Sequence, residues 1–203
     1  MLSIDPAGNS EKDNYKLLTG GVVPRPIAFV TTRSPKGTVN GAPFSFFNVV
    51  SSSPPRISLS IQRMAGKQKD TARNIEAVGE FVVHLVDQQN VGQVNQTAVS
   101  LPSDQSEIEL AKLTPVNSVK LAVPGVKEAK MRLECVLEHR LELEGEAGTT
   151  GCDFIIGKVV HFHIAEEIYE NGRIDPHGLG AVSRLAGHDY AKIGEMFSLK
   201  RPQ

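Results

Sequence analysis

The chain has 203 residues, and its 22 Lys and Arg against 23 Asp and Glu give a formal net charge of -1, which excludes a field that gathers nucleic acid or anionic membranes. Hydrophobic residues make up 40% and charged residues 22%, which excludes a disordered or fibrous chain and indicates a globular domain. No leader-like start and no window of about 18 apolar residues is present, so we expect a cytoplasmic protein that does not span a membrane.

The first residues, to about Glu11, are polar and predict an arm or an extended lead-in. Residues 13–18 then predict one or two helical turns that end at Gly20 and Gly21. Residues 27–32 predict a strand, and Ser-Pro-Lys-Gly at residues 34–37 predicts a turn into a second strand. This part of the chain therefore predicts a hairpin.

Prolines bound the next stretch, from Ala42-Pro43 to Pro54-Pro55, and remove backbone donors there. We expect an irregular, rigid rim rather than a central strand or a helix. The rim combines hydroxyls and amides with aromatic rings, which suits a flat heteroaromatic ligand with a polar, phosphorylated tail. The alternative is a buried aromatic corner with turn-forming serines. The residues concerned are Phe44, Ser45, Phe46, Phe47, Asn48, Ser51, Ser52 and Ser53.

Residues 57–61 alternate apolar and polar side chains, which predicts a strand with one buried face. A basic loop follows, and we expect Asp70 to cap a helix over residues 70–78 that stops at Gly79. The helix start together with Lys67, Lys69 and Thr71, with Arg63 nearby, can bind a phosphate. The alternative is a solvated basic loop in which Asp70 itself occupies the helix start.

The rest of the chain predicts more strands than helices. We expect a buried strand at residues 80–86, short helices at 90–98 and 107–113, and long strands at 129–143 and 153–164 joined by a turn at 145–151. Because the hairpins are sequential, the sequence predicts a mainly β protein, an antiparallel barrel with a few peripheral helices.

Histidine and cysteine residues give weak signals. His161 and His163 share a strand face, but no third ligand has suitable spacing, so we expect no metal. His84 in its apolar run predicts a buried, hydrogen-bonded histidine rather than a general base. Cys135 and Cys152 predict two reduced structural thiols, although a disulfide between them stays open.

Four segments carry a family resemblance. They are residues 24–32 (PRPIAFVTT), 40–48 (NGAPFSFFN), 53–55 (SPP) and 69–74 (KDTARN), and together they resemble the flavin reductase-like family of FMN-binding split barrels. The likeness extends from about Leu17 to residues 184–190. It implies one FMN-binding domain over residues 1–203, with an N-terminal arm (1–12), a C-terminal docking segment (170–203) and a homodimeric split barrel. FAD is an alternative cofactor.

The resemblance also implies site residues. Those near the flavin are expected to be Thr31, Thr32, Asn40, Ala42, Pro43, Phe44, Ser45, Phe46 and Asn48 for the ring and ribityl chain, and Ser51, Ser52, Ser53, Asp70 and Thr71 towards the phosphate. Arg63 and Lys67 join this set through the basic loop at the helix start. Arg184, His188 and Tyr190 are expected to reach the flavin or a nicotinamide; the alternative is a C-terminal loop docked on the barrel.

The function that follows is an NAD(P)H-dependent flavin reductase that passes electrons to free flavin or to a partner such as a monooxygenase component. No acid or base is required, since the flavin carries the redox chemistry. One alternative is an FMN-binding electron carrier of flavoredoxin type without its own nicotinamide site. Another is a structural barrel without flavin.

Overall fold

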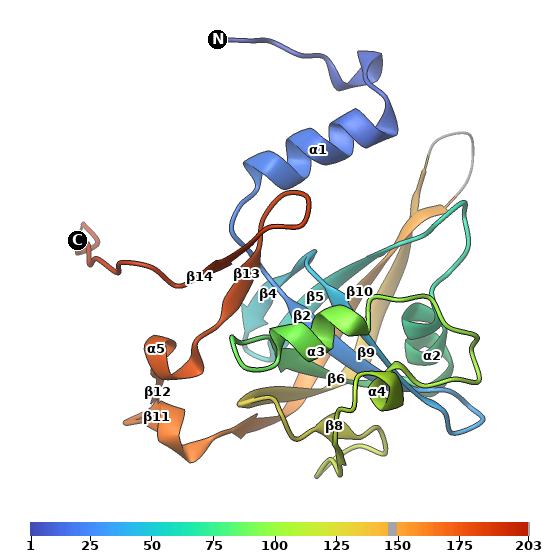
Figure 1. Ribbon diagram of the computed structural model, residues 1–203, viewed down its shortest axis with the longest axis vertical. Coiled ribbons are helices and arrows are strands. Elements are labelled where there is room, and N and C mark those ends of the chain that lie inside the picture. The colour runs from blue at the N-terminus through green and yellow to red at the C-terminus, as the bar shows by residue number, and fades with distance from the viewer. Residues whose placement is uncertain (146–149, 203) are drawn as a thin grey trace.

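A seven-stranded antiparallel sheet is the centre of the computed structural model, which describes residues 1–145 and 150–202 (Figure 1). Its strand order is β3-β2-β6-β9-β10-β5-β4. The strands are β2 (Ala28–Arg33), β3 (Val39–Phe44), β4 (Phe47–Ser52), β5 (Pro55–Gln62), β6 (Glu80–Leu85), β9 (Met131–Glu144) and β10 (Thr150–Ile164). The prediction of a mainly β, antiparallel protein is confirmed.

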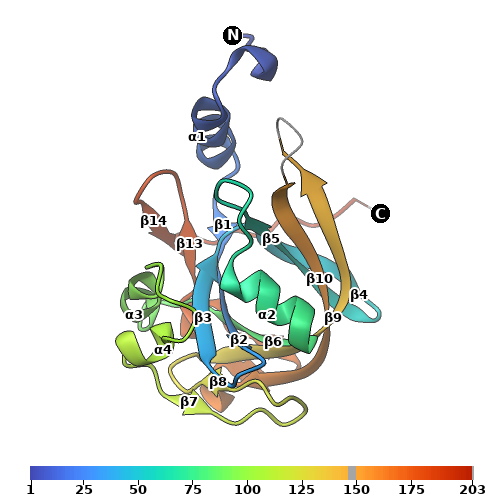
Figure 2. The ribbon, with the colours of Figure 1, turned by 90° about the vertical axis from the view of Figure 1, so that its right-hand side faces the viewer.

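The sheet rolls into a barrel that stays open along one seam. Its two edge strands, β3 and β4, are joined only by Ser45 and Phe46. Because a residue spans at most about 3.6 Å, this connection brings the start of β4 close to the end of β3. The two strands are nevertheless not hydrogen-bonded neighbours in the sheet. The result is a split barrel, with α2 (Asp70–Val78) packed beside β2 and β3 (Figure 2).

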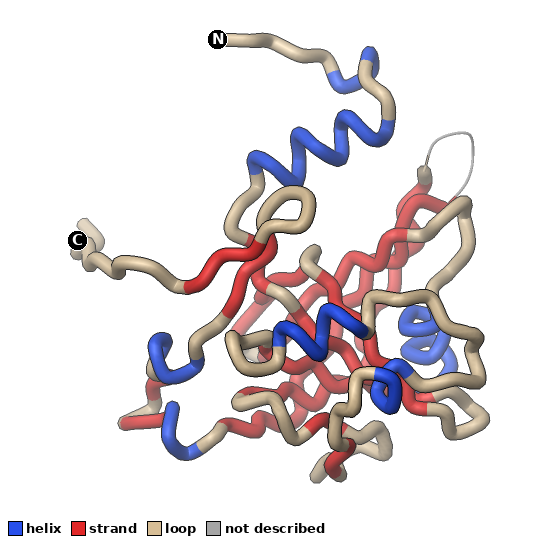
Figure 3. Tube along the Cα trace, in the orientation of Figure 1, coloured by secondary structure: helices blue, strands red, loops and turns tan. Residues whose placement is uncertain are grey.

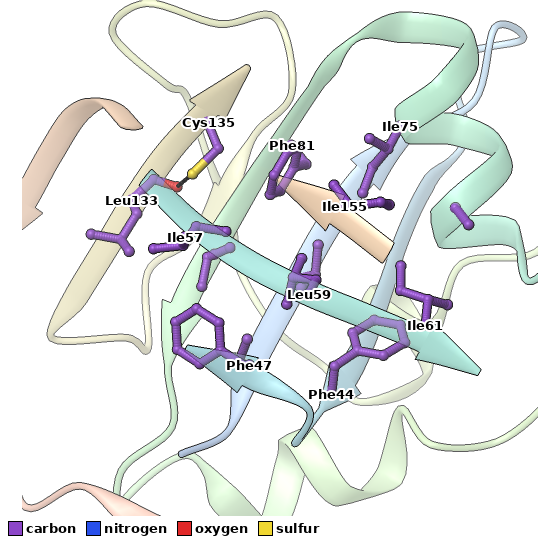
Figure 4. Close-up of a cluster of buried hydrophobic side chains, with 14 of the residues drawn as sticks. Phe44, Phe47, Ile57, Leu59, Ile61, Ile75, Phe81, Leu133, Cys135 and Ile155 are labelled. Atoms are coloured by element: carbon purple, nitrogen blue, oxygen red, sulfur yellow. Dashed lines mark hydrogen bonds between the residues drawn. The ribbon is translucent and has the colours of Figure 1, made fainter. Parts of the chain in front are cut away.

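Apolar side chains fill the barrel because the strands alternate with period two. In β5, Ile57, Leu59 and Ile61 point inward and are buried, as expected for residues 57–61 (Figure 4). Phe81 from β6 and Ile155 from β10 meet them in the same cluster. This interior fixes the register of the strands, since a shift by one residue would turn every buried side chain outward.

A second apolar cluster covers the outer face of β2. Phe29 packs there with Val94 of α3 (Val91–Gln96), with Ile108 of α4 (Glu107–Leu110), and with Leu113. Both faces of β2 are therefore buried, which explains the short β-rich run at residues 27–32. Both helices are shorter than the predicted ranges 90–98 and 107–113.

Smaller elements surround the barrel (Figure 3). They are the 3-10 helices η1 (Pro6–Gly8) and η3 (Glu166–Ile168), the helices α1 (Glu11–Gly21) and α5 (Pro176–Leu179), and three small sheets: β1 (Arg25–Pro26) with β13 (Val182–Arg184) and β14 (Tyr190–Lys192); β7 (Pro115–Val116) with β8 (Gly125–Val126); β11 (Tyr169–Glu170) with β12 (Arg173–Ile174). Helix α1 is longer than predicted and stands away from the barrel in both ribbon views. Among the described residues, no helix is long and apolar enough to cross a membrane.

The predicted irregular rim at residues 42–55 is wrong in its local structure. Strand β3 continues through Pro43 to Phe44, and β4 is a regular strand with one bulge near Val50. Pro43 is tolerated because β3 lies at a sheet edge, where alternate backbone groups need no partner in the sheet, whereas Pro54 lies in the turn after β4 and Pro55 is the first residue of β5. The prediction that this stretch does not form a central strand is confirmed for β3 and β4, which are the two edge strands.

The predicted cap of α2 is also wrong by one residue. Lys69 occupies the N-cap position without a side-chain cap hydrogen bond, and Asp70 is the first helical residue. The predicted stop at Gly79 is confirmed, since its φ of 78° lies in the left-handed region that glycine adopts readily. The long hairpin of β9 and β10 is confirmed. Of the predicted turn at 145–151, residues 146–149 lie outside the described residues.

Candidate functional site

A cavity of about 330 Å³ lies between the edge strand β3 and the start of α2, and we name it the β3–α2 pocket. Three segments form its walls: the second half of β3, the loop that leads into α2, and the loop after α3. Its lining residues are Asn40, Ala42, Pro43, Phe44, Met64, Lys67, Gln68, Lys69, Asp70, Thr71, Thr97, Ala98, Val99, Ser100, Leu101 and Glu107.

The sheet edge explains how β3 presents itself to this pocket. The backbone N–H of Gly41 points away from β2 and donates to Glu107 Oε2 at 3.3 Å. Because strand residues alternate in direction, the nitrogen of Pro43 faces the same way. Its missing hydrogen therefore removes no bond to β2. The apolar stretch from Ala42 to Phe44 can then form one wall of the pocket.

A buried polar network ties the pocket walls together. Asn40 Nδ2 donates to Glu107 Oε2 at 2.9 Å, and Asn40 Oδ1 accepts from Thr71 Oγ1 at 3.0 Å. Behind them, Asn74 Nδ2 donates to Thr32 Oγ1 at 3.1 Å. The network joins β2, β3, α2 and α4, and all five side chains are buried. It fixes the helix start against the strand, which is what a preformed ligand pocket requires.

Glu107 is the buried acid of the pocket, with 6% of its surface exposed. Burial raises the pKa of its carboxyl, and the nearby Asp70 adds to the effect, while the hydrogen bonds from Gly41 and Asn40 oppose it. The carboxyl therefore retains its proton to a higher pH than an exposed glutamate.

The pocket lining also includes basic side chains. Lys67 and Lys69 line the pocket, and Lys69 Nζ lies 5.7 Å from the centre of the Phe44 ring. Burial lowers the pKa of the Lys69 ammonium. No side chain caps the start of α2, and Asp70 pairs with Arg73. The first-turn N–H groups and two ammonium groups therefore provide donors and positive charge for an anion.

The structure brings seven of the residues expected near the flavin to this one pocket. They are Asn40, Ala42, Pro43, Phe44, Lys67, Asp70 and Thr71. Thr32 lies behind the wall, 3.4 Å from Asn40 Oδ1. The first part of the proline-bounded segment and the start of the helix thus form a common cavity, although they are 26 or more residues apart in the sequence.

The other expected residues lie outside the pocket lining. Arg63 makes two hydrogen bonds to Asp153, of 2.9 and 2.7 Å, and Thr31 Oγ1 donates to Pro124 O at 2.7 Å. Ser51 Oγ donates to Pro54 O at 2.7 Å, within the β4–β5 turn. Ser45, Phe46, Asn48, Ser52 and Ser53 likewise do not line the pocket.

The C-terminal residues gather beside α3. The guanidinium of Arg184 lies 4.6 Å from the centre of the Tyr190 ring, and Tyr190 Oη donates to Asn95 Oδ1 at 3.0 Å. Tyr190 also lines a separate cavity of about 420 Å³ between α3 and β14. His188 lies in the turn between β13 and β14. Helix α3 lines this cavity and the loop after α3 lines the β3–α2 pocket, so consecutive segments of the chain border the two cavities.

The pocket residues that the sequence interpretation missed are Met64, Gln68, Thr97, Ala98, Val99, Ser100, Leu101 and Glu107. Glu107 is the charged residue among them. It was treated only as the start of a short helix with an apolar side, and no local pattern pairs it with Asn40, 67 residues away. The one available signal was an acidic residue at a helix start, which is common on solvent-exposed helices as well.

The histidines behave as structural groups. His84 Nδ1 donates to Phe29 O and His84 Nε2 accepts from Val126 N, each at 2.9 Å; burial lowers the pKa of His84 to about 3. The prediction of a satisfied buried histidine is confirmed. His163 Nε2 lies 2.6 Å from Glu134 Oε1. Within residues 1–145 and 150–202, no cluster of three or more His, Cys, Asp or Glu is arranged to bind a metal. Cys135 and Cys152 are free and buried.

Comparison with known proteins decides the family. A family model described as a flavin reductase like domain matches residues 20–178. The chain belongs to the flavin reductase-like family. It is also 53% identical to an uncharacterised Bacillus subtilis protein over 95% of both chains. It is 50% identical to an uncharacterised protein of Halalkalibacterium halodurans, over 99% of this chain and 97% of that protein.

Several solved structures are similar to this chain along most of its length. Nitrilotriacetate monooxygenase component B from Bacillus cereus is 57% identical, with a TM-score of 0.96 over 98% of both chains. The 2-nitrobenzoate 2-nitroreductase of Pseudomonas fluorescens is 27% identical, with a TM-score of 0.89 over 99% of this chain and 96% of that one. Flavoredoxin of Desulfovibrio vulgaris, 22% identical with a TM-score of 0.75 over 88% and 91%, bears on the fold alone. The predicted family and split-barrel fold are confirmed, and the family places the chain among flavin-binding oxidoreductases.

Proposed function

We propose that the chain binds FMN in the β3–α2 pocket and works as an NAD(P)H-dependent flavin reductase. Electrons then pass to free flavin or to a protein partner such as a monooxygenase component. The observation that carries the proposal is the 57% identity to a monooxygenase component B, together with a family model for flavin reductases.

The pocket residues suit the parts of FMN. The apolar wall from Ala42 to Phe44 offers a flat surface to the ring, and the amide of Asn40 and the hydroxyl of Thr71 are polar groups for the ribityl chain. Lys67, Lys69 and the uncapped start of α2 offer charge and donors to the phosphate. FMN, when bound, supplies the electron-accepting chemistry, so the residues need only bind it, orient it and limit access of water.

A homodimer is part of the proposal. Large apolar side chains are exposed on α1 and on the C-terminal segment, including Leu18 at 62% and Phe197 at 82%. Surface of this kind is typical of a protein contact. Gel filtration at several concentrations, with light scattering, tests the dimer.

One anaerobic experiment separates the reductase from its alternative. Protein loaded with FMN is mixed with NADH or NADPH, and the visible absorbance of the flavin is followed. We expect bleaching within seconds, with one nicotinamide preferred. Bleaching only by another reduced protein would favour the flavoredoxin-type carrier. Protein that stays colourless with excess FMN would overturn both.

A further inference from the structure

A further cavity, of about 430 Å³, lies where β9 begins and β10 ends. None of its lining residues belongs to the β3–α2 pocket. The lining combines basic and apolar side chains: Val116, Lys127, Ala129, Lys130, Arg132, Phe162, His163, Ile164 and Ala165. We name it the β9–β10 pocket.

Strand register gathers basic side chains at this pocket. Arg132 pairs with His84 of β6 on one side and with His163 of β10 on the other. Side chains paired directly across antiparallel strands share one face of the sheet, and like charges there repel one another. His84 stays neutral because burial lowers its pKa to about 3, and His163 Nε2 lies 2.6 Å from the carboxylate of Glu134. Arg132 is the permanently charged basic group of this row.

Arg132 is fixed in position but is not neutralised. A Cβ atom at Gly125 would lie 3.0 Å from both Cδ and Nη1 of Arg132, so the guanidinium occupies space that the glycine leaves. Burial lowers the pKa of Arg132, and only the charge of Glu134 opposes this effect. In the described part of the chain, its guanidinium has no hydrogen-bond or ion-pair partner. The Arg132 nitrogens are not among the buried atoms that lack a partner in the described residues, so water reaches the guanidinium and an anion can take the place of that water.

The neighbouring acids are already occupied. Glu134 accepts from Val119 N at 2.6 Å and Lys120 N at 2.8 Å, in addition to its contact with His163. Glu128 accepts from Thr114 N at 3.0 and 3.1 Å. The two lysines add further positive charge. Lys130 Nζ donates to Gly178 O at 2.7 Å and so stays close to the pocket, and Lys127 is exposed.

We propose that the β9–β10 pocket binds a small organic anion, a carboxylate or a phosphate carried on a compact apolar body. The planar guanidinium of Arg132 matches either oxyanion with two parallel hydrogen bonds. Lys127 and Lys130 add charge at the rim. Phe162, which is 48% exposed, and Ile164 offer apolar surface to the body of the ligand. The volume is that of a small-molecule site. This binding site is additional to the proposed flavin site and does not depend on it.

Titration calorimetry on the full chain tests the proposal, with phenyl phosphate and benzoate as separate probes and with and without added FMN. We expect saturable binding of at least one probe, unaffected by FMN, and weakened about tenfold or more by Arg132→Gln. Lys127→Gln removes an exposed charge without disturbing the interior, so it serves if Arg132→Gln fails to fold, and it should also weaken binding. Lys158→Gln removes one exposed charge from β10 outside the pocket and is the matched control.

Each outcome of the calorimetry supports or overturns the proposed anion site. Binding of phenyl phosphate alone assigns the site to phosphates, and binding of benzoate alone assigns it to carboxylates. The proposal is overturned if neither probe binds, if FMN displaces the probe, or if Lys127→Gln binds as tightly as the unaltered chain. Equal weakening by Lys158→Gln would show general attraction to positive charge and would overturn it as well.

Discussion

The side-chain amide of Asn40 donates to Glu107 Oε2 across 2.9 Å, and this contact joins β3 to the start of α4 at the wall of the β3–α2 pocket. The same oxygen accepts from the backbone N–H of Gly41 at 3.3 Å. An edge strand normally leaves such donors to water. Here Glu107 Oε2 accepts from the backbone N–H of Gly41 and from the side-chain amide of Asn40 inside the protein. Glu107 therefore orders the strand that we propose to bind the flavin ring.

Removal of this acceptor should destabilise the fold. Glu107→Ala leaves two buried donors without a partner, and each costs about 1–3 kcal/mol, so we expect a loss of about 2–6 kcal/mol in the free energy of unfolding. Glu107→Gln keeps an oxygen in the same place and should cost less than about 1 kcal/mol. Urea unfolding of the two variants measures the difference. Equal stability of both variants would mean that the contact contributes little.

The raised pKa of Glu107 predicts a pH dependence of stability. The folded protein retains this proton above the ordinary value of 4.5, whereas the unfolded chain releases it there. As pH rises from 4.5 through the folded pKa, ionisation therefore favours the unfolded chain, and the stability due to the protonated group is lost. Below 4.5 this stability is fully present.

The measurement compares the unaltered chain with Glu107→Gln, which cannot ionise, by urea unfolding at a series of pH values. The unaltered chain should lose stability relative to the variant as pH rises above 4.5, and the difference should then become constant. An unaltered chain that instead gains stability relative to Glu107→Gln as pH rises above 4.5 would show that the hydrogen bonds from Asn40 and Gly41 outweigh burial.

Local patterns in the sequence predicted most of the elements because those elements depend on nearby residues. The alternation of Ile57, Leu59 and Ile61 predicted β5, and Gly79 predicted the end of α2. The prediction of an irregular rim is wrong because the prolines were considered without their neighbouring strands. Pro43 is compatible with a strand when that strand lies at a sheet edge and the proline nitrogen faces away from the partner strand, which here is β2.

The site was predictable only in part for a related reason. Asn40 and Thr71 were found because both belong to segments with a family likeness, and the fold brings them together. Glu107 has no such segment around it. Arg63 was expected at the phosphate, but Asp153, 90 residues further along the chain, binds its guanidinium. Pairing between distant residues decides which basic side chains remain available to a ligand.

Gly41 is predicted to be essential to the packing of α4. A Cβ atom there would lie 2.4 Å from Ile108 Cδ1 and 2.8 Å from Phe29 Cζ. Both atoms belong to a packed cluster, so Gly41→Ala should cost about 1–3 kcal/mol and displace Glu107, with weaker FMN binding. Gly92 in α3 has nothing within 4 Å of its Cβ position, so Gly92→Ala is the matched control and should not destabilise. Thermal unfolding and flavin fluorescence titration measure both effects. An equally stable Gly41→Ala would show that α4 can shift without cost.

Charge reversal at Lys67 and Lys69 should separate the phosphate of the ligand from its ring. FMN carries a phosphate and riboflavin does not, whereas ring and ribityl chain are common to both. Lys67→Glu with Lys69→Glu should weaken FMN about tenfold or more, through lost attraction and new repulsion at the start of α2. Riboflavin affinity should change little.

Lys12→Glu, on the distant helix α1, controls for net charge. Titration of flavin fluorescence at low and high salt measures the affinity of each protein for FMN and for riboflavin, and the FMN effect should shrink at high salt. Equal weakening of FMN and riboflavin would place the phosphate elsewhere and leave the lysines a role in the shape of the pocket.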